Sequence, residues 1–126
     1  DFSFSGLKTA VLYADRDIKD KSEKYKIEMA HEVQEAIIDV LLKKTFQAAE
    51  DHAVKTIILG GGVSANAELR KQFSEKAKAN NLDIVIPPSH LSTDNALMSA
   101  VTAYFHSNKK ASWETLEADA NLRVGE

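Results

Sequence analysis

The sequence has no cysteine among its 126 residues, and it has only two prolines and one tryptophan. The lack of cysteine excludes disulfides, zinc–thiolate sites and thiol nucleophiles from this stretch of chain. Its apolar runs are far shorter than the roughly 20 residues that cross a bilayer. We therefore expect a cytoplasmic protein without a membrane partner. The net charge of −3 argues against a dedicated nucleic-acid module, which is usually basic.

Hydrophobic residues make up 44% of the chain and charged residues 28%, which is typical of a globular protein with one modest core. The first residues place Phe2 and Phe4 two positions apart, a spacing typical of an extended segment. Because the sequence opens with neither a methionine nor a polar stretch, and this spacing is typical of the middle or end of an extended segment, we expect the sequence to be a piece of a longer protein. Residues 5–14 then predict a short helix capped by Ser5, with Lys8 on its exposed side.

A glycine turn in the middle of the sequence is the feature around which the prediction is built. Residues 56–59 form a short apolar run, typical of a buried strand. Gly60, Gly61 and Gly62 end this strand, and a helical pattern starts near Ser64. Glycine lets a backbone approach a ligand closely, and helix starts favour anions. A plain tight turn without a ligand is the commoner meaning of three glycines alone.

The residues after the glycine turn predict a βαβ unit. One helix face carries Leu69, Phe73 and Ala77, and asparagines at 80 and 81 suit a helix end. Residues 84–86 predict a second strand, which should run parallel to the first. The opposite helix face is expected to carry cations: Arg70, Lys71, Lys76 and Lys78.

Residues 23–51 show a long helical pattern that would extend over roughly 40 Å, more than the width of a small domain. Such a helix must either break or reach beyond the core. His31 lies in a near match to a zinc-protease motif, but Glu35 replaces the required second histidine. We interpret His31 as a solvent-exposed residue.

A second loop, at residues 89–96, follows the second strand and leads into a very apolar helix that should be buried. Asp94 in its first turn could cap the helix or ligate a metal. The carboxyl ends of parallel strands share one edge of a sheet, so this loop and the glycine turn should open on the same edge.

Three motifs in this order resemble the C-terminal part of the tRNA threonylcarbamoyladenosine transferase family, formerly labelled glycoprotease or O-sialoglycoprotein endopeptidase. The motifs are Phe4-Ser5-Gly6-Leu7-Lys8-Thr9, Gly61-Gly62-Val63-Ser64-Ala65-Asn66 and Ser92-Thr93-Asp94-Asn95-Ala96. The resemblance implies an α/β, actin-like ATPase (ribonuclease H-like) fold, helix-rich with a small parallel βαβ sheet. Residues 1–126 would be the C-terminal portion of a two-lobed domain that lacks its N-terminal lobe, with a tail at 107–126.

The resemblance also implies an activity: transfer of threonylcarbamoyl from its adenylate to the exocyclic amine of the adenosine beside the anticodon. The implied partners are tRNA, threonylcarbamoyl-adenylate and other subunits of the modification complex. Gly60 to Gly62 and Asn66 would bind the adenylate, and Asp94 would be one ligand of a divalent iron or zinc ion. The other ligands would be two histidines of the missing lobe. The family usually has cysteine at Ser92, a change from which we expect little consequence.

We expect the isolated chain to fold, to bind metal weakly and not to catalyse, because one carboxylate does not make a tight metal site. Two alternatives stay open: half of another actin-like ATPase or sugar or acetate kinase, and a non-catalytic partner subunit. The older endopeptidase idea finds no support in the residues.

Overall fold

The computed structural model describes residues 2–19, 21–109, 112, 114, 117, 118 and 121. The chain divides into two units, Asp1–Thr93 and Asp94–Glu126, and each has its own description here. The first contains helix α1 (Ser5–Asp17), helix α2 (Glu23–Asp51), strand β1 (Thr56–Ile58), 3-10 helix η1 (Gly62–Ala65), helix α3 (Ala67–Ala79), strand β2 (Asp83–Val85) and 3-10 helix η2 (Ser89–Leu91). The second contains helix α4 (Ala96–Phe105).

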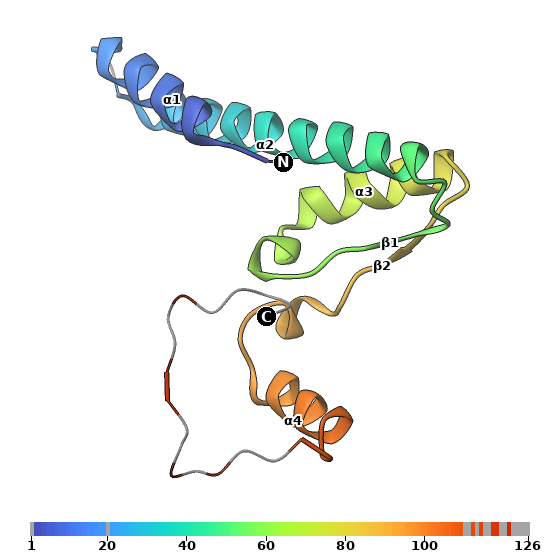
Figure 1. Cartoon of the computed structure of the whole chain (residues 1–126). Coiled ribbons are helices and arrows are strands. Elements are labelled where there is room, and N and C mark those ends of the chain that lie inside the picture. The colour runs from blue at the N-terminus through green and yellow to red at the C-terminus, as the bar shows by residue number, and fades with distance from the viewer. Residues whose placement is uncertain are drawn as a thin grey trace. The chain divides into compact units, whose positions relative to one another are not determined.

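The two strands run parallel, as predicted, with Ile57 opposite Ile84 in the register. The crossover is made by α3, whose C-terminal end is closed by Asn81 in the left-handed conformation at φ 54°. That conformation was expected of an asparagine at this place. The α/β, helix-rich character with a small parallel sheet is confirmed. Figure 1 shows α3 beside the second half of α2, with the sheet beyond it.

Helix α2 is unbroken over 29 residues, and only its second half joins the core. Ile38 is 2% exposed, whereas Ile27 on the first half is 64% exposed. The core combines side chains from α2, α3 and β1: Ile38, Leu42, Phe46, Ala49, Ile57, Leu69, Phe73 and Ala77. The sequence predicted that so long a helix either breaks or reaches beyond the core. The structure shows that α2 does not break and reaches beyond the core. Helix α1 lies beside its first half (Figure 1).

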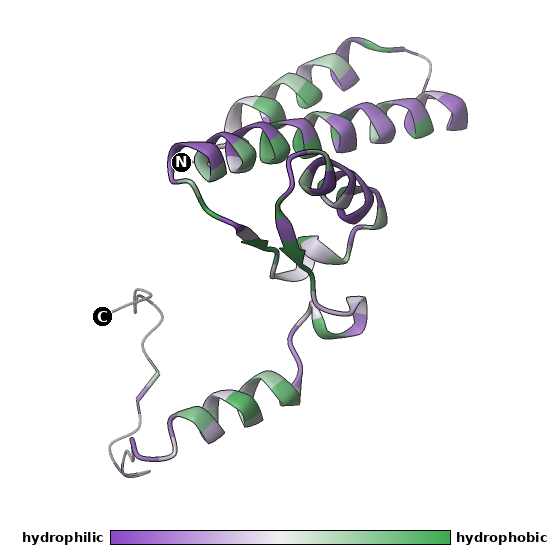
Figure 2. Cartoon of the chain, turned by 90° about the vertical axis from the view of Figure 1, so that its right-hand side faces the viewer, coloured by the Kyte–Doolittle hydropathy of each residue, from purple (hydrophilic) through white to green (hydrophobic). Residues whose placement is uncertain are grey.

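Two predictions about burial are wrong for the described residues. Strand β1 is buried only at Ile57, because the neighbouring Ile58 points to the other face and is 75% exposed. Helix α4 is as apolar as predicted (Figure 2), but none of its residues is buried. Apolar composition sets the tendency to be covered, and burial further requires a packing partner. The sequence also predicts a short amphipathic segment in the tail, which contains Trp113, and Trp113 lies outside the described residues.

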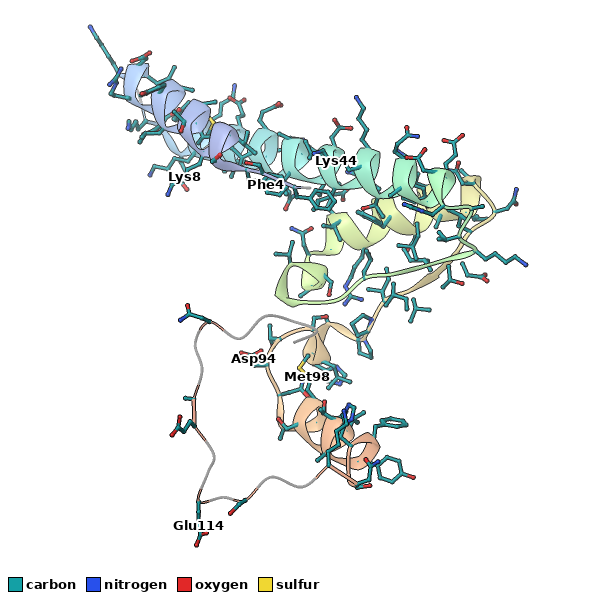
Figure 3. The ribbon with its side chains drawn as sticks, in the orientation of Figure 1. Phe4, Lys8, Lys44, Asp94, Met98 and Glu114 are labelled. Atoms are coloured by element: carbon teal, nitrogen blue, oxygen red, sulfur yellow. The ribbon has the colours of Figure 1, made fainter. Side chains whose placement is uncertain are left out.

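At the start of the chain, Ser5 does not cap α1. Phe4 holds the N-cap position, and no side chain makes a capping hydrogen bond there. Ser5 instead begins the helix, so its hydroxyl is one residue too late to reach the free N–H groups of the first turn. Lys8 is exposed, as predicted (Figure 3). No described helix is long and apolar enough to cross a membrane.

Candidate functional site

The glycine turn follows β1 and is fixed by Ser64. The Ser64 hydroxyl donates to the Gly61 carbonyl at 2.7 Å, and the Ser64 N–H donates to the same oxygen at 3.0 Å. Gly61 adopts φ 81° and ψ 167°, a backbone region that is essentially open to glycine alone. Ser64 is 3% exposed, so these bonds are shielded from water. The turn is therefore a rigid, glycine-dependent structure.

The outer side of the turn is open. A Cβ atom built on Gly60 or Gly61 would meet no atom within 4 Å. Among the described residues, no hydrogen bond uses the N–H group of Gly60 or Gly61. Backbone donors in this state suit an anion such as phosphate. The sequence predicted a helical pattern that starts near Ser64. In the structure the 3-10 helix η1 comes first, and the α-helix α3 begins only at Ala67.

Asn66 has two roles at the start of α3. Its side-chain oxygen caps the helix by accepting from the Leu69 N–H at 3.0 Å. Its amide nitrogen donates to the Gln34 side chain of α2 at 2.9 Å. The cap explains why α3 begins where it does, since asparagine is among the best N-cap residues. Asn66 is thereby held in one orientation beside the glycine turn.

The second loop meets the glycine turn at the same edge of the sheet, as predicted. A Cβ on Gly62 would lie 3.9 Å from the Thr93 methyl group. The two segments η1 and η2 are in contact within the first unit. This prediction is confirmed as far as Thr93, the last residue of that unit.

The sequence predicted that Arg70 lies on an outward cationic face of α3, and this prediction is wrong. Its guanidinium donates to the Pro87 carbonyl at 2.5 Å and to the Ser92 hydroxyl at 3.0 Å. Ser92, from which little consequence was expected, is 2% exposed and also donates to the Pro88 carbonyl at 3.4 Å. Lys76 likewise turns inward, with its ammonium 5.2 Å from the centre of the Phe46 ring. Sequence periodicity misassigned both cations because long side chains can curl back over a core.

Asp94 opens the second unit and leads into α4 (Figure 3). It does not cap that helix: Asn95 holds the N-cap position and accepts from the Met98 N–H at 3.2 Å. This removes the capping alternative for Asp94. No three histidine or acidic side chains of the described residues gather into a metal-binding group. A single carboxylate does not fit a metal site on its own, so further ligands would have to come from elsewhere.

Sequence reasoning missed an apolar groove between α1 and α2. The groove has a volume of about 540 Å³, and its apolar lining includes Val11, Val33 and Ile37. Its polar lining includes two hydrogen-bonded pairs, Asn66 with Gln34 and Tyr25 with Asp15. The apolar side chains of α2 were visible in the sequence, but their pairing with α1 was not.

Asp15, Lys21 and Tyr25 form a polar cluster in which the pKa of the Tyr25 hydroxyl is perturbed. Burial raises the pKa of the Tyr25 hydroxyl above its usual 10.0, and the negative charge of Asp15 raises it further, against an opposing effect of Lys21. Lys21 itself pairs with Asp15 at 2.5 Å. The Tyr25 hydroxyl donates a hydrogen bond to Asp15 at 3.5 Å.

Comparison with known proteins decides which family this arrangement belongs to. Residues 1–101 match the family TsaD, described as tRNA N6-adenosine threonylcarbamoyltransferase. The chain belongs to the TsaD family. The resemblance of the three motifs is thus confirmed at the level of the family.

Individual relatives of the TsaD family agree over most of the chain. A protein of Thermosipho africanus (strain TCF52B), named tRNA N6-adenosine threonylcarbamoyltransferase, is 46% identical over 125 residues, which cover 98% of this chain and 38% of the relative. Proteins of the same name from Thermotoga neapolitana and Kosmotoga olearia are 41% and 47% identical, over 98% and 82% of this chain. They are covered over 37% and 31% of their own lengths. The chain therefore spans about a third of the length of these relatives.

Proposed function

We propose that this chain is the C-terminal portion of a two-lobed, actin-like tRNA-modifying enzyme. The full-length protein would transfer threonylcarbamoyl from its adenylate to the exocyclic amine of the adenosine beside the anticodon. The observation that carries this proposal is the TsaD family match over residues 1–101, together with relatives that bear the transferase name. Because the chain spans about a third of those relatives, the rest of the protein would complete the site.

The glycine turn supports a role in binding the adenylate. The N–H groups of Gly60 and Gly61 are open and are suited to bind the phosphate of an adenylate. Gly62 completes the same glycine turn. Preorganised backbone donors also stabilise negative charge that develops on a leaving phosphate, and they do so without reorganisation cost. In this proposal the turn binds the leaving group of the transfer reaction.

In this proposal Asn66 binds the ribose side of the same adenylate. Its carboxamide is already oriented by Leu69 and Gln34, so a ligand group would meet a fixed partner. An amide nitrogen has two N–H donors, and the bond to Gln34 uses one of them. The remaining donor is the group that we assign to the ribose side of the adenylate.

Asp94 would be one of several metal ligands in the full-length enzyme. The described residues do not form a metal site by themselves. We propose that the remaining ligands, including a pair of histidines, come from the N-terminal lobe, and that the native ion is iron or zinc. Other subunits of a modification complex and a cytoplasmic location belong to the same proposal.

The family match favours the transferase over the two alternatives. A sugar or acetate kinase half would share the actin-like fold, but fold alone does not carry a reaction. Against a non-catalytic partner subunit, this chain has both Asn66 and Asp94. A histidine pair four residues apart in the preceding lobe would discriminate the transferase from both.

The test is a calorimetric titration of the full-length protein with a non-hydrolysable threonylcarbamoyl-adenylate analogue. Asn66→Ser retains a good helix cap but loses the carboxamide, so the proposal predicts at least tenfold weaker binding without loss of folding. Lys71→Ala, an exposed change on the same helix, should leave binding unchanged. Equal affinity of Asn66→Ser and the unmodified protein would contradict the assignment.

A further inference from the structure

Gln34 is the second partner of the Asn66 carboxamide, and it reaches Asn66 from another helix. Its side-chain oxygen accepts from the Asn66 amide nitrogen at 2.9 Å, and 32 residues of sequence separate the two. Both side chains are half-buried, and both line the apolar groove between α1 and α2. A hydrogen bond in such a place can serve the stability of the fold or the geometry of Asn66, and the neighbouring contacts separate these two roles.

The helix cap alone does not fix the Asn66 carboxamide. The cap holds one atom of the group, the oxygen, which accepts from the Leu69 N–H at 3.0 Å. A planar group held at one atom can still turn about that atom, and the terminal torsion of an asparagine is broad. The bond from the nitrogen to Gln34 fixes a second atom and thereby sets the plane of the group. Because both N–H bonds of an amide lie in its plane, the direction of the remaining N–H is then determined as well.

Gln34 is suited to hold another side chain because it lies where α2 enters the core. Ile38, one helical turn further along α2, is 2% exposed. Among the residues that the structure describes, the Gln34 side chain makes no hydrogen bond besides that to Asn66. The bonding of Gln34 within the fold is therefore directed at one group, the amide that we assign to the ribose side of the adenylate.

A second polar contact between the same two helices does not involve Asn66. Gln72 of α3 donates to the two carboxylate oxygens of Glu35 at 3.0 and 3.3 Å, and to Glu68 at 3.0 Å. Like Gln34, Gln72 is half-buried. Loss of either glutamine removes a hydrogen bond between α2 and α3, but only the loss of Gln34 releases Asn66. Gln72 is therefore a matched control for the contribution of Gln34 to stability.

We propose that Gln34 is a positioning residue of the adenylate site. It acts through Asn66, by fixing the plane of the carboxamide so that its free N–H is presented to the ribose side of the adenylate. The proposal rests on the function proposed above, because it requires that Asn66 binds the adenylate. It adds a residue that needs no contact with the substrate. Preorganisation of a binding group improves affinity because the ligand does not have to immobilise that group.

The first test is a calorimetric titration of the full-length protein with the non-hydrolysable threonylcarbamoyl-adenylate analogue. Gln34→Leu removes the acceptor at similar size, and it should bind the analogue about three- to tenfold more weakly, the cost of immobilising one side chain. Gln72→Leu should keep the affinity of the unmodified protein. Gln34→Ala carries the same expectation and replaces the leucine variant if that does not fold. Unchanged affinity on loss of Gln34, or an equal loss in the Gln72 variant, would overturn the proposal.

The second test asks whether Gln34 acts through Asn66. In the Asn66→Ser background, Gln34→Leu should weaken binding of the analogue no further, because the group that Gln34 positions is already absent. The same loss in both backgrounds would mean that Gln34 acts independently of Asn66, and the positioning role would be wrong.

The third test separates positioning from a purely structural role by steady-state kinetics with tRNA, adenylate and any partner subunits. Gln34→Leu should raise the KM for threonylcarbamoyl-adenylate and leave both kcat and the KM for tRNA unchanged, as expected for an interaction that is made equally in the ground state and the transition state. A lower kcat at an unchanged KM is the result expected of a partly unfolded enzyme, and it would contradict the positioning role.

These outcomes also separate the proposal from the proposed function. Weaker binding in Asn66→Ser, together with unchanged binding in Gln34→Leu, would remove the positioning role and leave the role of Asn66 intact. Unchanged binding in Asn66→Ser would remove both roles. Weaker binding in Gln34→Leu, with no loss in Gln72→Leu and no further loss in the double variant, would support the positioning role.

Discussion

The amide of Asn66 donates a hydrogen bond to Gln34 at 2.9 Å, which links the cap of α3 to the middle of α2 across 32 residues of sequence. The same side chain accepts from the Leu69 N–H. One residue thus starts a helix, joins two helices and lies beside the glycine turn.

Asn66→Ala should destabilise the chain by roughly 1–2 kcal/mol, because it removes the helix cap and the bond to Gln34. Asn66→Ser should recover about half of that loss, since serine also caps helices. Gln34→Ala removes only the bond between the helices and should cost about 1 kcal/mol. Urea unfolding followed by circular dichroism measures all three. Equal stability of the alanine and serine variants would show that the cap contributes nothing.

The glycine turn offers a matched pair of substitutions. Gly61→Ala should cost about 1–3 kcal/mol of unfolding free energy, because φ 81° with ψ 167° strains any residue with a Cβ atom. Gly60→Ala meets open space and should change stability by less than about 0.5 kcal/mol. Thermal unfolding of the two variants compares them directly. A Gly61→Ala protein as stable as the unmodified chain would contradict the described turn.

The position of the core along α2 can be tested with two isoleucines of one helix. Ile38→Ala should cost about 2–5 kcal/mol, since Ile38 is 2% exposed within the core. Ile27→Ala should cost less than about 1 kcal/mol in this chain, because Ile27 is 64% exposed. Chemical unfolding of the 126-residue chain provides both values. Similar losses at the two positions would mean that the first half of α2 is also packed.

Tyr25 gives a prediction about pH. Burial and Asp15 raise the pKa of its hydroxyl in the folded state, so folding favours the protonated form. The stabilisation this provides is complete below the unfolded pKa of about 10 and is lost as the pH rises through the folded pKa. The difference in ultraviolet absorbance between the unmodified chain and Tyr25→Phe should therefore show a tyrosine that ionises above pH 10. Ionisation of Tyr25 at or below pH 10 would contradict the described cluster.

Local sequence rules predicted much of the first unit. The parallel strands follow from two apolar runs separated by one amphipathic helix, and the left-handed Asn81 follows from its side chain. The meeting of Gly62 and Thr93 follows from strand direction alone. Each of these depends on neighbours in sequence or on a topological rule.

The errors at Arg70 and at Asn66 have one physical origin, and the error at Asp94 has another. Arg70 was assigned to an outward face because helical periodicity gives the side of the helix from which a side chain leaves, and not where its end group binds. Its acceptors, Pro87 and Ser92, are distant in sequence. The bond between Asn66 and Gln34 was missed for the same reason. Asp94 was considered as a helix cap because sequence pattern locates a helix start only to within a residue or two, and Asn95 is the cap.

The proposed activity is tested most directly by mass spectrometry of nucleosides from tRNA that has been incubated with full-length protein and threonylcarbamoyl-adenylate, together with any partner subunits it requires. The account predicts threonylcarbamoyl-adenosine in tRNA treated with the unmodified protein, at least tenfold less with Asn66→Ser, and none with the isolated 126-residue chain. A folded, adenylate-binding full-length protein that leaves the tRNA unmodified would contradict the account.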